Sequence, residues 1–327
     1  MTLEAGFVVL SALTFGFLNG RTAAANILAT VISTHALSLR KAVWMTAAAT
    51  MISPFLLGLA VASTIGRGVI AEYAITSPII YAGLLAAITW IGITSLLGIP
   101  NSTTHALIGG LVGATWAGAG LDAILADGLL KIGLTLFVSP FVGLIAGFYM
   151  VKLCYFLARG ASPRINNWFR RGQVITAFLL AVTQANNDVQ KTIGIIMLGL
   201  IAAGSIKEFE VPLWVMLATA GATALGSLLG GRRIIRTLGA KFFRVRPVHG
   251  FGSQLASSVV LLAVGLLGGP VSPTHVMSSS IIGAGSADRV QMVRWEAVTR
   301  IVLSWLITIP AVVMIGAGYY GIMGMFW

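Results

Sequence analysis

Pro100-Asn101-Ser102-Thr103-Thr104-His105 and Pro270-Val271-Ser272-Pro273-Thr274-His275 share the spacing Pro-x-Ser-x-Thr-His within a strongly apolar chain. Hydroxyl and imidazole groups are costly to bury in lipid, because every polar group there needs a partner inside the protein. This chain carries the pattern twice. The two turns therefore predict a polar interior inside a membrane protein, and the rest of the sequence agrees.

The composition places these turns in a membrane. Of 327 residues, 57% are apolar and 9% are charged, and the mean hydropathy is +0.94. Apolar runs of about 20 residues, enough to span a bilayer, recur throughout. The first run, 5–18, follows Glu4 rather than a basic segment, so we expect a retained helix and not a cleaved signal peptide. One cysteine, Cys154, excludes an intrachain disulfide framework. The sequence predicts an all-α, polytopic membrane protein.

The net charge of +12 would suggest nucleic acid in a soluble protein, but here the basic residues gather in a few loops, as positive-inside topology requires. We therefore expect no nucleic-acid partner, a plasma-membrane location and cytoplasmic basic loops. The basic clusters are Arg40 with Lys41, Arg159 through Arg171, Arg232 through Arg246, and Arg289 with Arg294. The acid-bearing loops between them hold Glu72, Asp122 with Asp127, and Glu208 with Glu210.

The alternation of loops suggests how often the chain crosses the bilayer. The apolar segments are 5–34, 42–64, 77–97, 98–120, 129–158, 173–205, 210–230, 249–268, 269–286 and 295–324. If each crosses once, the basic clusters share one face and both termini lie outside. Alternatively, segments 98–120 and 269–286 form re-entrant helical hairpins, and the stretch 121–158 holds two crossings. The loop charges allow either arrangement.

The chain divides into two halves with the same plan. Residues 1–158 and 173–327, joined by a basic cytoplasmic linker at 159–172, each run from an asparagine-containing segment to a Pro-x-Ser-x-Thr-His turn and a final long segment. The loop at 40–41 is basic, whereas its counterpart at 207–210 is mainly acidic, so equivalent loops face opposite sides. Such inverted-topology repeats surround a midplane substrate site in secondary transporters. Anion channels can have the same symmetry, so an anion channel remains the alternative function.

Polar residues interrupt the middle of the first long segment in each half. They lie at 19–26 in the first half and at 184–192 in the second. Ionisable groups at this depth usually face a bundle interior or a wet cavity and indicate function. Asp188 and Lys191, three apart, share a helix face, and the alternative is that they simply neutralise each other.

The Pro-x-Ser-x-Thr-His turns suit an anion. Proline fits the first turn of a helix, where backbone N–H groups and the helix dipole favour negative charge, and the serine and threonine hydroxyls add donors. Ordinary N-capping by serine is the alternative reading. His105 and His275 are either proton relays or hydrogen-bonded supports. We predict no enzyme, because no nucleophile, metal set or paired acid and base is evident.

At these residues the sequence resembles the inorganic phosphate transporter (PiT) family over nearly its whole length. The segment 187–194, Asn-Asp-Val-Gln-Lys-Thr-Ile-Gly, is similar to the family's second Asn-Asp signature, and both turns match its hairpins. The stretches 230–234, 247–251 and 294–310 are similar too. The resemblance implies a secondary transporter with inverted repeats, a central oxyanion site, coupling to Na⁺ or H⁺, a homodimer and elevator-like movement.

The first half departs from the family pattern. Relatives carry an Asn-Asp or His-Asp pair where this chain has Thr22 and Ala23, and often a glutamate where it has Gln254. Losing the carboxylate removes a hard oxygen ligand, which disfavours a cation site in this half. The neighbouring Arg21 is instead expected to attract the anion directly.

Hydrogen phosphate can donate its proton to a carboxylate, whereas sulfate at neutral pH has none to donate, so Asp188 favours phosphate. The prediction is phosphate symport with H⁺ or Na⁺, with a sulfate permease as the alternative and no cofactor. The expected substrate-binding residues are Arg21, Thr22, Asn26, Ser102, Thr104, Asn187, Asp188, Ser272 and Thr274. Asp188, Gln190 and Asn26 are expected to hold the coupling ion, and the only expected metal is a Na⁺ at Asp188.

Overall fold

The computed structural model describes residues 3–99, 101–230 and 245–325. Pro100 and the basic residues Arg232, Arg233, Arg236, Lys241 and Arg244 lie outside these ranges. The helices are α1 (Leu3–Ser33), α2 (Leu39–Leu56), α3 (Ala60–Gly68), α4 (Ser77–Leu97), α5 (Thr103–Ala119), α6 (Ala126–Leu157), α7 (Ile165–Ala202), α8 (Leu213–Leu228), α10 (Pro247–Leu266), α11 (Pro273–Ser286) and α12 (Trp295–Met323). Short 3₁₀ turns occupy Glu72–Ala74, Leu121–Ala123 and Val290–Met292. The described ranges contain no strand, so the all-α prediction is confirmed.

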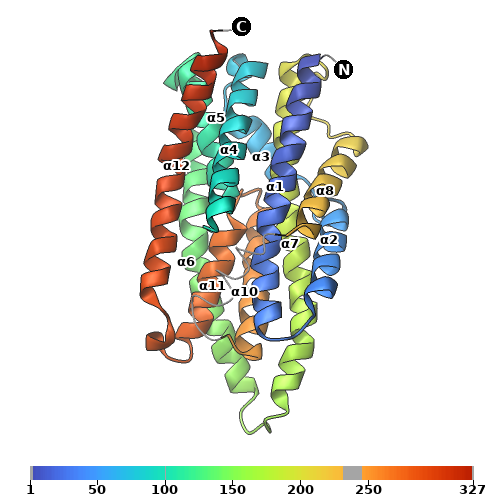
Figure 1. The fold of residues 1–327 in the computed structure, drawn as a ribbon, viewed down its shortest axis with the longest axis vertical. Coiled ribbons are helices and arrows are strands. Elements are labelled where there is room, and N and C mark those ends of the chain that lie inside the picture. The colour runs from blue at the N-terminus through green and yellow to red at the C-terminus, as the bar shows by residue number, and fades with distance from the viewer. Residues whose placement is uncertain (1–2, 100, 231–244, 326–327) are drawn as a thin grey trace.

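The helices form one elongated bundle, with both termini at the same end (Figure 1). The connections α1–α2, α6–α7 and α11–α12 lie at the opposite end. These three connections carry the described basic clusters, whereas the acid-bearing connections α5–α6 and α7–α8 lie toward the termini. The alternation read from the sequence therefore corresponds to two ends of the bundle.

Long apolar helices make this a multi-pass membrane protein. By length and composition, α1, α4, α6, α10 and α12 could each span a bilayer, and α2 with α3 forms a sixth span bent by 74°. The helix α7, with 38 residues, is long enough, but its polar run at 184–192 lowers its hydropathy. The helix α6 is a single unbroken helix of 32 residues, so the alternative in which 121–158 holds two crossings is wrong, and the segment 129–158 counted as one crossing agrees with the structure.

Two helical hairpins, α4–α5 and α10–α11, meet at their tips. The Thr104 hydroxyl donates to the Val271 carbonyl oxygen (2.7 Å), and the rings of His105 and His275 have centroids 4.6 Å apart. Figure 1 shows α4 and α5 in the half of the bundle that holds the termini and α11 in the other half. The two hairpin tips therefore meet inside the molecule, and the re-entrant alternative stays a prediction.

The two halves of the chain pack reciprocally. The hairpin helix α5 lies against α12, and α11 lies against α6. Glycines allow both approaches, because a Cβ built on Gly113 would lie 2.0 Å from the Val313 carbonyl oxygen, and one on Gly283 would lie 2.0 Å from that of Leu144. Close backbone contact through small residues is a usual way for membrane helices to pack. The inverted repeat itself stays a prediction.

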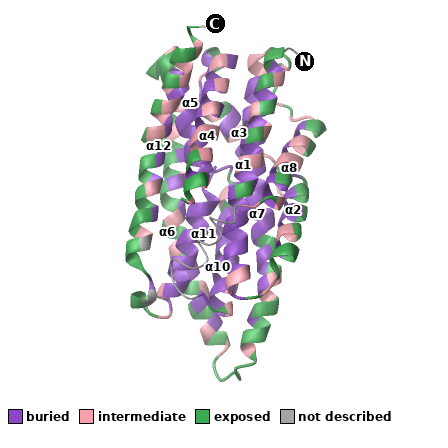
Figure 2. Cartoon of the chain, in the orientation of Figure 1, coloured by how far each residue is buried: buried purple, intermediate pink, exposed green. Residues whose placement is uncertain are grey.

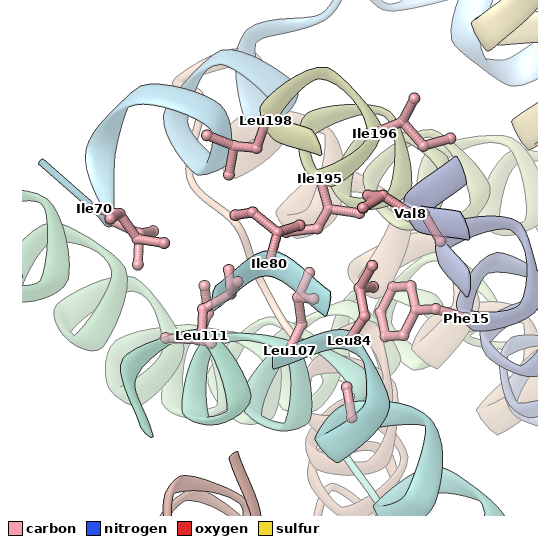
Figure 3. Packing of buried hydrophobic residues seen from close by; sticks show 14 of the residues in the cluster. Val8, Phe15, Ile70, Ile80, Leu84, Leu107, Leu111, Ile195, Ile196 and Leu198 are labelled. Atoms are coloured by element: carbon pink, nitrogen blue, oxygen red, sulfur yellow. The ribbon is translucent and has the colours of Figure 1, made fainter. Parts of the chain in front are cut away.

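Apolar side chains from four helices fill the bundle on the side of the termini. Figure 3 shows residues of α1, α4, α5 and α7 in contact there, among them Val8, Phe15, Leu84, Leu107 and Ile195. Buried residues concentrate along the bundle centre, whereas the outer faces of α6 and α12 are largely exposed (Figure 2). These outer faces carry large apolar side chains such as Phe137 and Leu306. An apolar exterior around a partly polar centre is the arrangement expected of a protein in lipid.

Candidate anion site

The polar segments of α1 and α7 lie side by side within continuous helices. Asn19, Asn26, Asn187 and Asp188 are each at most 2% exposed, and Lys191 is fully buried. The Asn19 side chain donates to the Asp188 backbone carbonyl at 3.5 Å, which joins the two segments directly. The residues that interrupt the two apolar runs therefore meet in the interior.

Each hairpin tip begins a helix with a serine cap. Ser102 Oγ accepts from the His105 backbone N–H at 3.1 Å, and Ser272 Oγ accepts from that of His275 at 3.4 Å. N-capping, the alternative reading of the motif, is thus present in both copies. A capping hydroxyl keeps its own hydrogen, so each serine can still donate to an anion.

Two asparagines of α1 form hydrogen bonds with the two hairpin tips. The Thr103 hydroxyl donates to Asn19 Oδ1 (2.8 Å), and Asn26 Nδ2 donates to Thr274 Oγ1 (3.1 Å). Asn26 and Thr274 are thereby in direct contact, and the bond from Thr104 to the second tip brings the first tip beside them. The structure thus gathers most of the predicted substrate-binding hydroxyls around α1.

The polar segment of α7 contains two buried charged residues, Asp188 and Lys191. Lys191 Nζ lies 2.8 Å from Asp188 Oδ1, so the two residues share a helix face as predicted and form a buried ion pair. Asn187 Nδ2 donates to the Gly269 carbonyl oxygen, just before the second tip, over a long 3.5 Å. The Oδ1 atoms of Asn186 and Asn187 are buried without a hydrogen-bond partner in the described structure. Side-chain amides can rotate to present either an acceptor or a donor.

Two predicted residues lie elsewhere. Arg21 is exposed on α1, whereas the other predicted binding residues are buried. The oxygen of the Gln190 side chain accepts from the backbone N–H groups of Val61 (2.7 Å) and Ala62 (3.2 Å), so it caps the first turn of α3. Thr22 is buried, and its hydroxyl donates to the Leu18 carbonyl within α1.

The two tip histidines form a pair. Their rings are edge to face, and the ring of His275 also stacks on that of Trp305 with centroids 3.8 Å apart. His105 Nδ1 and His275 Nε2 have no hydrogen-bond partner among the described residues. Both histidines line a groove of about 410 Å³ between α6 and α12, whose other walls are mainly apolar. A proton relay here would consist of two rings in contact.

A row of buried hydrogen bonds between side chains of α1, α7 and α10 was not anticipated from the sequence. Gln254 of α10 donates to Thr30 Oγ1 and accepts from Thr176 Oγ1, each at 2.8 Å. Farther along, the Thr34 hydroxyl donates to Gln173 Oε1 at 2.6 Å. The signal in the sequence was the spacing of Asn26, Thr30 and Thr34, four residues apart and therefore on one face of α1.

A second unanticipated cluster ties α10 and α11 to α6. Asp288 accepts from Tyr155, forms a salt bridge with the Arg246 guanidinium and lies 3.1 Å from His249 Nε2. Burial raises the pKa of Asp288, but the Tyr155 hydrogen bond and the charges of His249 and Arg246 outweigh it, so the pKa lies below its usual value. The four residues come from three separate parts of the chain, and no short motif marks them.

Hairpin tips that meet beside paired polar helices in a buried interior resemble the arrangement of secondary transporters. The comparison with known families specifies the family. The chain belongs to the phosphate transporter family, whose model matches residues 19–316. The chain therefore belongs to a family of transporters and not to a family of enzymes.

Relatives in bacteria support the same family. A probable low-affinity inorganic phosphate transporter of Rhizobium meliloti is 41% identical, with 94% of this chain and 93% of the relative aligned. One of Bacillus subtilis, described in the same words, is 38% identical over 97% and 96% of the two chains. A solved structure, described as the sodium-dependent phosphate transporter, superposes with a TM-score of 0.92 over both full lengths at 22% identity. That likeness establishes the fold.

Proposed function

We propose that this protein is a secondary active transporter that carries inorganic phosphate across the membrane in symport with H⁺ or Na⁺. The observation that supports this most directly is the meeting of two serine-capped hairpin tips beside Asn187 and Asp188. Two helix N-termini and several hydroxyls supply donors for a tetrahedral oxyanion. The family and the names of the relatives support phosphate, whereas nothing found supports the sulfate alternative.

The proposed binding set is narrower than the sequence suggested. Asn26, Asn187 and the tip hydroxyls of Ser102, Thr104, Ser272 and Thr274 frame the anion. Thr22 lies on the same face of α1 and stays in the set. Arg21 is left out because it is exposed, and Gln190 because its oxygen caps α3.

We propose that the Asp188 carboxylate distinguishes a protonated substrate anion from an unprotonated one. Lys191 occupies one carboxylate oxygen, and the second oxygen remains available to accept the proton of hydrogen phosphate. Sulfate would present an unprotonated oxygen to the same carboxylate and would be repelled. His105 and His275 are proposed to pass protons between the tips and the groove that they line.

The halves 1–158 and 173–327 are proposed to act as inverted repeats that expose the site alternately. The reciprocal packing of α5 on α12 and of α11 on α6 supports this proposal. The end with the basic connections, including 159–172, is proposed to face the cytoplasm, with the termini outside, in the plasma membrane. A homodimer is proposed as well.

Radiolabelled uptake into proteoliposomes tests the transport function. Counterflow against unlabelled phosphate should accumulate the label, because a carrier exchanges substrate across the membrane, and sulfate should compete weakly. Thr274→Val removes a tip hydroxyl and should lower exchange, whereas Thr46→Val, which removes a buried hydroxyl bonded to the Ala42 carbonyl within α2, should not. Downhill flux without counterflow would indicate a channel, and sulfate exchange that phosphate does not inhibit would contradict the substrate.

A further inference from the structure

The ion pair on α7 has properties beyond mutual neutralisation. In the described ranges, Asp188 and Lys191 are the only Asp, Glu, Lys or Arg residues that are buried. Their side chains are 3% and 0% exposed, and Nζ lies 2.8 Å from Oδ1. Isolated buried charges are strongly disfavoured, so a buried pair inside a candidate transport site marks a functional position.

The charges around the pair are few. The polar residues that α1 directs to this region, Asn19 and Asn26, are neutral amides. The other titratable groups that interact electrostatically with Lys191 are His105 on α5 and His275 on α11. Among the described residues, no group of three or more His, Cys, Asp and Glu side chains could hold a metal ion. Of the carboxylates in the part of the chain that the structure describes, only that of Asp188 is buried, and Lys191 already forms an ion pair with it.

From this geometry we infer that the Lys191 ammonium takes the place of a coupling sodium ion at Asp188, so that phosphate uptake needs no Na⁺. The inference rests on the proposed transport function and refines its coupling ion to the proton. A lysine ammonium is a compact point charge. Tethered one helical turn from Asp188 on the same helix, it places its positive charge 2.8 Å from a carboxylate oxygen.

The residues at Asp188 do not fit a sodium ion while Lys191 is in place. A hard cation needs several oxygen ligands, and here an ammonium donor occupies one carboxylate oxygen. A second positive charge beside it would be repelled strongly, because the surroundings are buried. The fold is shared with a sodium-dependent phosphate transporter, but a shared fold does not carry over the ligands of an ion.

Variants at position 191 test the inference. Lys191→Ala removes the ammonium and leaves space beside a free carboxylate, whereas Lys191→Met removes the charge but fills the space. We expect wild-type phosphate counterflow and melting temperature to be the same in NaCl and in choline chloride. Lys191→Ala should lose about tenfold in sodium-free counterflow, and NaCl should specifically restore exchange and raise its melting temperature. Lys191→Met should respond to neither salt.

Two controls separate the possible outcomes. The double variant Asp188→Asn/Lys191→Ala has the same space without the carboxylate, so its response to Na⁺ should disappear. If Lys191→Ala does not fold, the response of the wild-type protein to Na⁺ provides the test. A wild-type protein whose exchange rises tenfold in NaCl, or whose melting temperature rises in NaCl but not in choline chloride, would overturn the inference.

The proposed function can fail separately. If no phosphate exchange occurs in any salt or pH gradient, the transport proposal is wrong, while the melting temperatures still decide whether Lys191 excludes Na⁺. If exchange occurs and a folded Lys191→Ala protein shows no response to Na⁺ by either measurement, phosphate transport stands and the inference about Lys191 fails.

Discussion

The polar segments of α1 and α7 occupy equivalent places in the two halves, yet they make different contacts. On α1, Asn19 and Asn26 are neutral and each bonds to a different hairpin tip at 2.8–3.1 Å. On α7, Asn187 makes one long bond at 3.5 Å, and Asp188 is held by Lys191. The α1 segment thus makes short bonds to both tips, whereas the α7 segment holds a buried charge pair and unpaired amide oxygens, and we propose that α7 contributes more to substrate chemistry and α1 more to aligning the tips. Symmetry of fold does not require symmetry of function.

The variant Asp188→Asn should have the largest effect, because it removes the negative charge that distinguishes the α7 segment from the α1 segment. Removing one partner of a buried ion pair leaves Lys191 unpaired and costs about 3–5 kcal/mol of stability. We expect concentrative phosphate uptake to fall at least about a hundredfold, because the charged carboxylate proposed to interact with the substrate proton is replaced by a neutral amide. Uptake is measured in proteoliposomes, after confirming that the variant is inserted and monodisperse. Full cation-dependent uptake by this variant would remove Asp188 from the mechanism.

Comparing Asn26→Leu with Asn187→Leu separates a structural role of the α1 segment from a substrate-binding role of the α7 segment. Asn26→Leu leaves Thr274 without its partner and should cost about 1–3 kcal/mol. Asn187→Leu breaks only a long bond, so it should cost less stability and lower phosphate exchange more. Melting temperatures and counterflow rates, measured on the same preparations, decide the order. The reverse order would mean that α1 carries the chemistry.

Much of this division was predictable. The polar interruptions, the repeated turns and the i, i+3 spacing of Asp188 and Lys191 follow from local sequence, because helical geometry fixes which residues share a face. The exposure of Arg21 and the capping of α3 by Gln190 were not predictable, because both depend on which distant helix packs against α1 or α7. The continuity of α6 agrees with the segment 129–158 counted as one crossing and contradicts only the alternative of two crossings, because apolarity alone does not mark where one long helix ends and another begins.

The two hairpins are anchored to the neighbouring long helix by different chemistry. Thr89 of α4 and Tyr319 of α12 share a neutral hydrogen bond of 2.9 Å, whereas Asp288 joins α10 and α11 to Tyr155 of α6 through charged contacts. The pKa of Asp288 is lower in the folded protein than its usual value. Its contribution to stability is therefore present above the unfolded pKa of about 4 and is lost as the pH falls through the lower folded pKa.

Asp288→Asn should consequently cost about 2 kcal/mol at pH 7. It should also flatten the dependence of the melting temperature on pH between about 5 and 3, where the wild-type protein loses the contribution of this carboxylate. Tyr319→Phe is the matched control, because it removes a neutral anchor from the other hairpin and should lower stability without changing the pH dependence. Identical pH profiles for wild type and Asp288→Asn would show that the cluster does not stabilise the fold through this carboxylate.

The smallest expected effect compares the two serine caps. Ser102→Ala and Ser272→Ala each remove a side-chain acceptor for a histidine N–H and should each cost about 1 kcal/mol, a typical value for an N-cap. If the caps are only structural, melting temperature falls and the apparent affinity for phosphate is unchanged. If both hydroxyls also donate to the anion, the apparent affinity falls for each variant, and the ratio of the two losses measures how evenly the tips share the substrate. A loss confined to Ser272→Ala would place phosphate nearer Asn187 and the charged half, which extends the asymmetry of α1 and α7 to the tips themselves.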